Sequence, residues 1–232
     1  MRMLRMTKIE QFVDRLSQVN LPNVFNPYSD ICEIYDHANS PSERRNNLIA
    51  QLEKSVALHV DTIWFGRDLG YRGGRRTGVA LTDEMHLPLL AHRCKDERIK
   101  KATAGPLMPE RTANVIWSVI SELPHVPFLW NAFPFHPHDA EDQFTNRCHT
   151  KSERLTIWHL NIELIELLNP KIVVAIGNDA HNALDKLDLE CLYVRHPSYG
   201  GQADFLSGIR KIYNLDTASN RQSSTQSSFA LL

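Results

Sequence analysis

The stretch Ile172-Val173-Val174-Ala175-Ile176-Gly177-Asn178 decides the fold that we predict for this chain. Its first five residues are all apolar, which is typical of a strand buried on both faces of a parallel sheet. Gly177-Asn178 ends the apolar run, and Asn178 is suited to cap a following helix, which we place at residues 179–187. The stretch therefore predicts a buried strand that leads directly into a helix.

Outward from this unit, strands and helices alternate along the chain. We expect three more strands, at residues 60–65, 128–133 and 191–194. Helices are expected at residues 9–19, 43–58, 113–120, 151–168 and 205–213, and residues 20–41 are expected to be irregular. Thr150 and Glu153 have the spacing of a capping box, which marks a helix start. The alternation predicts an α/β protein with three layers, α/β/α, around a central, mainly parallel four-stranded sheet.

The ends of the predicted strands indicate where a binding site would lie. In sheets of this kind, ligands bind beside the carboxyl ends of the strands. Three of the four strands lead into polar loops rich in Gly, Arg or His, at residues 66–77, 131–139 and 195–202. The convergence of these loops predicts a site at that edge of the sheet.

Composition places the chain among globular proteins. Of its 232 residues, 42% are hydrophobic and 23% are charged, which is enough apolar material for a sizeable core. We expect one domain at residues 1–215, in which residues 1–45 form an N-terminal helix and an extended segment. Residues 216–232 are rich in Ser, Thr, Gln and Asn, and we expect a disordered tail there.

Charge and cysteine content narrow the class of protein further. The 26 basic and 27 acidic side chains nearly cancel, so attraction to nucleic acid has to come from a local basic patch. The four cysteines lie far apart in sequence, which predicts reduced thiols rather than a zinc or iron–sulfur site, and no cofactor is expected. No apolar run suits a signal peptide or a membrane span, so we expect a cytoplasmic protein.

The segment Gly66-Arg67-Asp68-Leu69-Gly70-Tyr71-Arg72-Gly73-Gly74-Arg75-Arg76-Thr77-Gly78 is the first candidate motif. Its five glycines allow tight turns and a close approach of the backbone to a ligand. Its four arginines are suited to contact phosphates, although the Gly-Lys-Ser/Thr ending of a phosphate-binding P-loop is missing. A solvated, flexible basic loop explains the same composition equally well.

Two further motifs place a polar residue near a predicted strand end. Leu129-Trp130-Asn131-Ala132-Phe133-Pro134-Phe135-His136-Pro137-His138 contains Asn131. Its amide can donate and accept at once, which suits the edge of a nucleobase, but it can also bond neighbouring backbone. Arg195-His196-Pro197-Ser198-Tyr199-Gly200-Gly201 places His196 at a strand end, where a histidine is either structural or catalytic.

The histidines after the middle strand raise a different possibility, a metal-dependent hydrolase. His136 and His138 are two residues apart, and such a pair on an extended segment can share a metal with Asp139 or His149. The rest of a ligand set is not evident, and the flanking prolines suit a rigid structural loop. We therefore predict no metal site.

Together, the three motifs resemble those of the uracil-DNA glycosylase superfamily. Its members carry a glycine-led first motif, an asparagine at the end of a middle strand and a His-Pro-Ser motif near the C-terminus, here matched by 66–70, Asn131 and 196–198. The surroundings resemble one bacterial branch over residues 25–205. The resemblance implies an enzyme that turns a base out of DNA and hydrolyses the N-glycosidic bond of uracil or another deaminated base.

The resemblance also implies roles for individual residues. Asp68 would orient the attacking water and His196 would stabilise the negative charge on the leaving base, so these are the expected catalytic residues. The residues expected to bind the base are Asn131, Leu81, Gly66 and Tyr71. The residues expected to contact DNA are Arg72, Arg75, Arg76, Ser198, Tyr199, Gly200 and Gly201. The expected partner is DNA with a damaged or deaminated base, bound by a monomer.

Departures from the branch bear on activity. Arg67-Asp68-Leu69 stands where the branch has Glu-Ala-Pro, and Leu81 replaces an aromatic residue that stacks on the base, an interaction that contributes about 1–3 kcal/mol. Asp68 coincides with the water-positioning aspartate of the best-known members, but Arg67 beside it could lower its pKa or occupy the pocket. These departures favour an alternative, a member of the same fold that binds a base or DNA without catalysis. Altered specificity, for example toward a deaminated purine, is an intermediate possibility.

Overall fold

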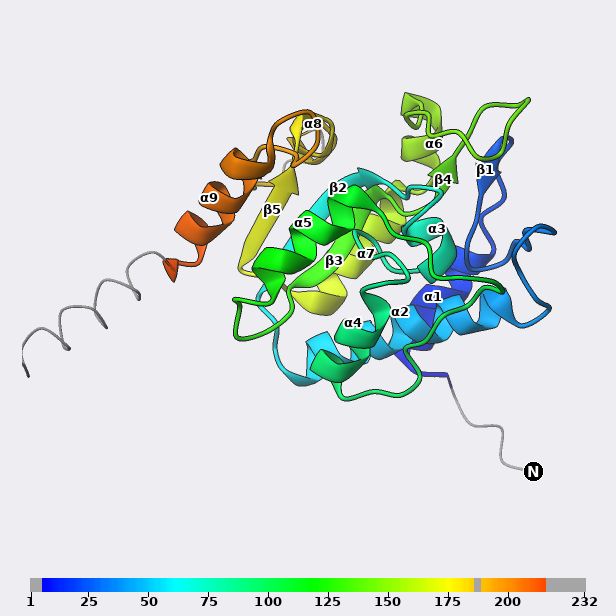
Figure 1. The fold of residues 1–232 in the computed structure, drawn as a ribbon, viewed down its shortest axis with the longest axis horizontal. Helices are drawn as coiled ribbons and strands as arrows, with labels where there is room; N and C mark the ends of the chain where they lie inside the picture. Colours follow the sequence, from blue (N-terminus) through cyan, green and yellow to red (C-terminus); the bar gives the residue numbers. More distant parts are fainter. Residues whose placement is uncertain (1–5, 186–188, 216–232) are drawn as a thin grey trace, which may run out of the picture.

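A four-stranded parallel sheet forms the middle of the computed structural model, which describes residues 6–185 and 189–215 (Figure 1). The strands lie in the order β3-β2-β5-β6, so β2 pairs with both β3 and β5. Their bounds are Thr62–Asp68 for β2, Phe128–Phe133 for β3, Ile172–Ile176 for β5 and Leu192–Val194 for β6. A separate antiparallel pair joins β1 (Val24–Phe25) to β4 (His136–Pro137).

Helices cover both faces of the sheet (Figure 1). Side chains of α1, α2 and α7 pack on one face, and those of α4, α5 and α9 contribute to the cluster on the other. The helix bounds are α1, Lys8–Ser17; α2, Ser40–Ala57; α3, Gly74–Thr77; α4, Leu87–Cys94; α5, Arg111–Ile120; α6, Lys151–Thr156; α7, Trp158–Leu168; α8, Asn178–Asp185; and α9, Gln202–Ile212.

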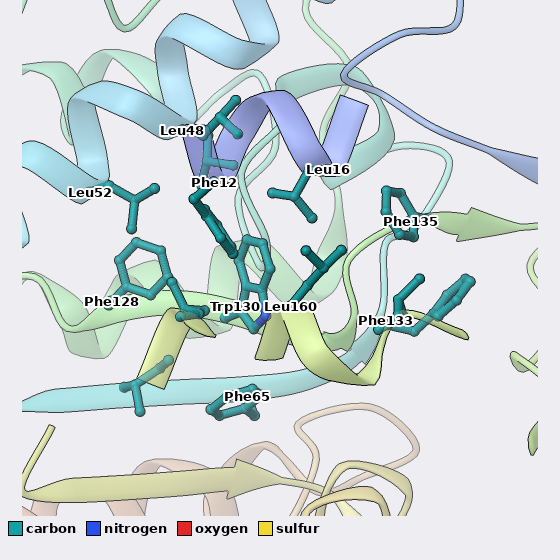
Figure 2. Packing of buried hydrophobic residues seen from close by; sticks show 14 of the residues in the cluster. Phe12, Leu16, Leu48, Leu52, Phe65, Phe128, Trp130, Phe133, Phe135 and Leu160 are labelled. Carbon is teal, nitrogen blue, oxygen red and sulfur yellow. The ribbon is translucent and has the colours of Figure 1, made fainter. Parts of the chain in front are cut away.

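The face toward α1, α2 and α7 carries an aromatic cluster (Figure 2). Every second residue of a strand points to the same face, which places Phe65, Phe128 and Trp130 on this side. Figure 2 shows leucines and phenylalanines of the helices packed on them: Phe12, Leu16, Leu48, Leu52 and Leu160. Burying an aliphatic or phenylalanine side chain of this size stabilises the fold by about 1.5–3 kcal/mol, so this cluster is a main reason why the strands hold their positions.

The alternate residues of the strands form the second cluster. Trp64 and Leu129 point toward α5 and α9, and the ring of Trp64 meets that of Phe205 edge to face, with centroids 6.2 Å apart. Asn161 braces β3 from the first face, because its Nδ2 donates to the Ala132 carbonyl at 2.9 Å. The end of β3 is therefore fixed from both faces of the sheet.

The predicted fold class is confirmed, and β3 and β5 have the predicted bounds. β2 is longer than predicted, because Gly66 pairs with Asn131 and Asp68 pairs with Phe133 in the parallel register with β3. A stretch that its composition assigned to a loop is therefore strand. Asp68 ends a strand in the sheet instead of lying in a loop.

The helices differ from the prediction in several places. The predicted helix 151–168 is two helices, α6 and α7, because Ile157 leaves helical geometry with φ −103° and ψ 5°. The capping box of Thr150 and Glu153 is confirmed, whereas Asn178 is the first residue of α8 and not its cap. α3, α4, β1 and β4 were not predicted, and α3 lies in the segment 66–77 that was expected to be a loop. The end of the predicted helix 179–187 and the predicted tail 216–232 fall outside the described residues, and the domain assignment 1–215 stays a prediction.

Across the described ranges, none of the helices combines the length and the apolar character that crossing a membrane requires.

Candidate functional site

One pocket brings the three sequence motifs together. It has a volume of about 480 Å³ and lies at the carboxyl ends of β2, β3, β5 and β6. Asp68 is the last residue of β2, Asn131 lies near the end of β3, and His196 follows β6. The predicted residues that line it are Gly66, Asp68, Leu81, Asn131, His196, Ser198 and Tyr199.

Asn131 is buried, with 1% of its surface exposed, and its Oδ1 has no hydrogen-bond partner among the described residues. A buried acceptor without a partner costs about 1–3 kcal/mol. The amide lies against Gly66, where a Cβ atom would be 2.3 Å from Oδ1. Gly66 therefore makes room for the amide, and Asn131 is one of the residues that line the pocket.

His196 is held in one tautomer by the residues that follow it. Its Nδ1 accepts the backbone N–H of Ser198 at 3.2 Å and lies 2.6 Å from Ser198 Oγ. Because a backbone N–H can only donate, Nδ1 carries no proton, and the neutral ring has its proton on Nε2. Burial and then the charge of Arg67 lower the pKa of His196, against an opposing effect of Asp179. The neutral imidazole is thus the form present at pH 7.

Asp68 is paired on both carboxylate oxygens. His149 Nδ1 donates to Oδ1, and Arg67 Nε donates to Oδ2 at 2.5 Å. Arg67 also donates from Nη1 to Asp179 Oδ2 at 2.8 Å. Only 5% of the Asp68 side chain is exposed. Arg67 therefore lies along the pocket wall, tied to two carboxylates.

Leu81 and Tyr71, both expected to bind the base, have different positions. Leu81 lines the pocket with a left-handed backbone, φ 55°, and its Cδ2 lies 3.0 Å from where a Cβ of Gly66 would be. Tyr71 lines a neighbouring apolar pocket of about 370 Å³, where its ring meets Phe144. The structure therefore places Tyr71 in this neighbouring pocket and not among the residues that line the base pocket.

Arg75 and Arg76, which were predicted to contact DNA, are buried inside the protein. Arg75 is fully buried, with its guanidinium 4.0 Å from the ring centroid of Phe25 and Nη2 donating to Gln143 Oε1 at 2.7 Å. Arg76 is 6% exposed and pairs with Glu84 at 3.2 Å. Both guanidinium groups are thus engaged by partners inside the protein.

Arg72 is different, because it is exposed. Its Nε donates to the hydroxyl of Tyr71 at 2.8 Å, and its guanidinium lies 5.3 Å from the centre of the Tyr71 ring. Of the three arginines predicted to contact DNA, only Arg72 remains available for that role.

The loop after His196 projects an aromatic ring from the rim of the pocket. Tyr199 is 98% exposed and has φ 52°, and Gly200 follows with φ 77°. Two successive left-handed residues are uncommon and tend to occur at functional sites. Gly201 is buried, and a Cβ there would lie 2.2 Å from the His196 carbonyl. Its lack of a side chain lets the loop fold back on His196.

A groove of about 770 Å³ continues from the pocket between α5 and the start of α9. It shares Thr112, Ser198 and Tyr199 with the base pocket. Exposed polar residues of α5 line its other wall, namely Arg111, Asn114 and Ser118.

Several residues of the site gave no signal in the sequence. Glu110, just before α5, lines the pocket, and its carboxyl lies against Gly70 and Gly73. Enclosure by the protein and then the negative charge of Asp83 raise the pKa of Glu110 to about 7. His149 was considered only as a metal ligand, and Arg111 stood in no motif. Each comes from a segment that only the fold brings to the strand ends.

The histidines that suggested a metal site have other partners. His136 is buried, its Nδ1 lies 3.1 Å from Arg75 Nη1, and its Nε2 lies 2.8 Å from the Thr145 carbonyl. Burial and the charge of Arg75 lower the pKa of His136 to about 3. Within residues 6–185 and 189–215, no group of three or more His, Cys, Asp or Glu side chains is arranged to hold a metal.

Comparisons with known proteins show a structural likeness. No protein-family model and no curated protein sequence matches the chain. The fold is similar to the crystal structure of wild-type SMUG2 from Pedobacter heparinus, a member of the uracil-DNA glycosylase superfamily. The TM-score is 0.60 with 15% sequence identity, over 94% of this chain and 100% of that chain. The chain therefore shares the fold of that structure.

Proposed function

We propose that this protein is a DNA glycosylase that hydrolyses the N-glycosidic bond of uracil or another deaminated base. One observation carries the proposal: Asp68, Asn131 and His196, far apart in sequence, line a single pocket. The volume of that pocket, about 480 Å³, accommodates one heterocycle together with its sugar. The superfamily fold supports the same class of reaction.

Recognition of the base is assigned to Asn131. A base inside a duplex cannot be reached, so it must turn out into the pocket, which costs a few kcal/mol. Once there, a ring N–H of the base can donate to Asn131 Oδ1, which otherwise has no partner among the described residues. Binding then removes the cost of a buried unsatisfied acceptor.

Departure of the base is assigned to His196. As the N-glycosidic bond breaks, negative charge builds on the base and positive charge builds on the sugar. The neutral ring of His196 donates from Nε2 to a carbonyl oxygen of the base and stabilises that negative charge. Because Ser198 fixes the tautomer, this donor needs no reorganisation at the moment of reaction.

Asp68 is assigned the role of positioning the water that attacks the sugar. A carboxylate has about four lone-pair sites, so the bonds from His149 and Arg67 leave each oxygen able to accept one more hydrogen bond. A water held there attacks the sugar carbon, and the carboxylate offsets the positive charge on the sugar. Asp68 can thus act while paired.

The DNA strand is assigned to the groove between α5 and α9. Tyr199 projects at the junction of groove and pocket, where its ring can fill the space left by the extruded base. Arg111 and Arg72 are exposed on either side of the pocket and are suited to contact phosphates. Ser198, Gly200 and Gly201 belong to the same loop and keep their proposed place at the DNA.

Two substitutions test the assignment on single-stranded DNA that contains uracil. We expect His196→Ala to lower the rate of base release by about 10²–10³-fold, because an electrostatic donor to the leaving group is lost. Asp68→Asn should lower it by about 10²–10⁴-fold, because the carboxylate that positions the water is lost. Alkali-sensitive strand breaks measure the release, and circular dichroism checks folding. Activity that survives both changes would refute the assignment.

A second candidate function is a base-binding or DNA-binding protein without turnover. The pairing of Arg67 with Asp68, together with Leu81 in place of an aromatic ring, favours it. A band-shift assay on DNA that contains uracil, beside the cleavage assay, separates the two. Binding without strand breaks supports the binder, and strand breaks support the enzyme.

A further inference from the structure

Glu110 forms part of the pocket wall in an unusual way. Its carboxyl lies directly against the backbone of the loop that follows Asp68. A Cβ atom built at Gly70 would lie 2.7 Å from Oε1, and one at Gly73 would lie 2.2 Å from Oε2. The carboxyl thus occupies the space that side chains at these two positions would need. Neither the sequence motifs nor the proposed mechanism gives it a role.

The charged groups around Glu110 favour its neutral form. Asp83 lies beside it and accepts the Glu110 backbone N–H on Oδ2 at 2.6 Å. Glu84, which follows Asp83 in sequence, accepts the backbone N–H of Met108 on Oε2 at 2.9 Å. The nearby cation, Arg72, acts in the opposite direction, but enclosure and Asp83 outweigh it and bring the pKa of Glu110 to about 7. His86 interacts with the other oxygen of Asp83.

We propose that Glu110 selects which bases the pocket accepts, by donating a hydrogen bond from its protonated carboxyl to a carbonyl oxygen of the bound base. This inference rests on the proposed function and deepens it. Deamination replaces an exocyclic amino group, which donates, by a carbonyl, which accepts. A protonated carboxyl carries an O–H donor that matches the carbonyl, whereas a carboxylate can only accept and repels it.

The proposal fixes the direction of a pH effect. Below pH 7 the donor is present, and as the pH rises through 7 the carboxyl loses its proton and the donor disappears. The kcat/KM for a deaminated base should therefore fall by up to about tenfold per pH unit above 7. His196 cannot produce this fall, because its neutral imidazole is the active form and persists as the pH rises.

Two variants of one position provide the test. Glu110→Gln keeps an N–H donor that does not titrate, and Glu110→Ala removes the donor. On single-stranded uracil DNA between pH 5.5 and 9, we expect Glu110→Gln to stay within about threefold of the wild type at pH 6 and to lose the fall above pH 7. Glu110→Ala should be at least about tenfold lower at pH 6. Glu122→Gln, an exposed carboxylate paired with Arg210, is the matched control.

A binding measurement separates this inference from the proposed function. Anisotropy with oligonucleotides that carry 2′-fluoro-deoxyuridine or 2′-fluoro-deoxycytidine, which resist cleavage, reports base preference without turnover. We expect the wild type and Glu110→Gln to prefer the uracil form and Glu110→Ala to lose that preference. Wild-type activity or preference combined with an unchanged pH profile in Glu110→Gln would overturn the role of Glu110 alone. A wild type with neither activity nor preference would overturn both proposals.

Discussion

Asn131 and Asp68 lie near the ends of neighbouring strands, yet their side chains are in opposite states. Asn131 Oδ1 is buried without a hydrogen-bond partner among the described residues, and Gly66 leaves space for it to stay so. Asp68 has a donor on each oxygen, His149 on one and Arg67 on the other. The acceptor on the Asn131 side of the pocket thus has no donor among the described residues, whereas both acceptors on the Asp68 side have donors from the protein.

The difference between the two sides separates recognition from hydrolysis. In the proposed function, the buried acceptor of Asn131 gains a hydrogen bond when a base binds, which assigns this side of the pocket to recognition. On the Asp68 side, the cation Arg67 is paired with the carboxylate that the proposed mechanism uses. Substitutions of the residues that neighbour Asn131 and Asp68 should therefore act differently. Among these substitutions, the largest effect is expected for Gly66, on the recognition side.

Gly66→Ala should displace the Asn131 amide from the position in which its Oδ1 has no hydrogen-bond partner among the described residues. The new Cβ would lie 2.3 Å from Asn131 Oδ1, so the amide must move or the strands must part. A displacement of about 1 Å in such a group lowers kcat/KM by about 100-fold, and overpacking costs about 1–3 kcal/mol of stability. Gly208→Ala in α9, where a Cβ meets only Val194 at 3.0 Å, is the control. Kinetics on uracil DNA decide, and a change below about threefold in Gly66→Ala would contradict the role of the glycine.

Arg67→Ala should free Asp68 Oδ2 from its ion pair with Arg67. Removing a cation beside the developing positive charge on the sugar is expected to raise kcat by about tenfold, which corresponds to about 1.4 kcal/mol. The charge of Arg67 also lowers the pKa of His196. The variant should therefore begin to lose activity at a higher pH than the wild type when the solution is acidified. Arg67→Lys keeps the charge and serves as the control, and a lower kcat in Arg67→Ala would show that Arg67 assists the reaction.

Glu110→Gln should change how the free energy of unfolding depends on pH. Its effect is expected to be the smallest of the three substitutions. The pKa of Glu110 is raised in the folded protein, so its protonated form favours folding and the wild type loses stability as the pH rises from about 4.5 through 7. Glutamine does not titrate, so the variant should be more stable at pH 8, by about 1 kcal/mol after allowance for solvent around the carboxyl. Urea unfolding at pH 4.5 and pH 8 measures it. An equal difference at both values would count against the raised pKa.

The sequence was sufficient for the framework of the site. A continuous apolar run such as 172–176 predicts a strand buried on both faces, and parallel strands place their carboxyl ends at one edge. Those two rules were enough to expect Asn131 and His196 at one edge of the sheet. The pocket that they share with Asp68 agrees with that expectation.

The burial of Arg75 and Arg76 could not be predicted from the sequence of their own segment. Arg75 and Arg76 are buried because aromatic rings and polar groups of distant segments surround them, including Phe25, Gln143 and Glu84. A Gly- and Arg-rich stretch gives no sign of such partners. The same limit explains β2, where pairing with Asn131 and Phe133 overrides the loop-like composition of 66–68.

The position of β2 between β3 and β5 also has a consequence for how the chain reaches its native state. Ile63 pairs with Phe128 on one side and with Val173 on the other, so both neighbours of this strand are distant in sequence. Such pairings must overcome the entropy of closing long loops before they stabilise anything, which makes folding slow. During synthesis, the first strand of the sheet must wait for residue 176 to leave the ribosome before both of its edges can be covered. We therefore expect the nascent chain to need protection from aggregation over most of its translation.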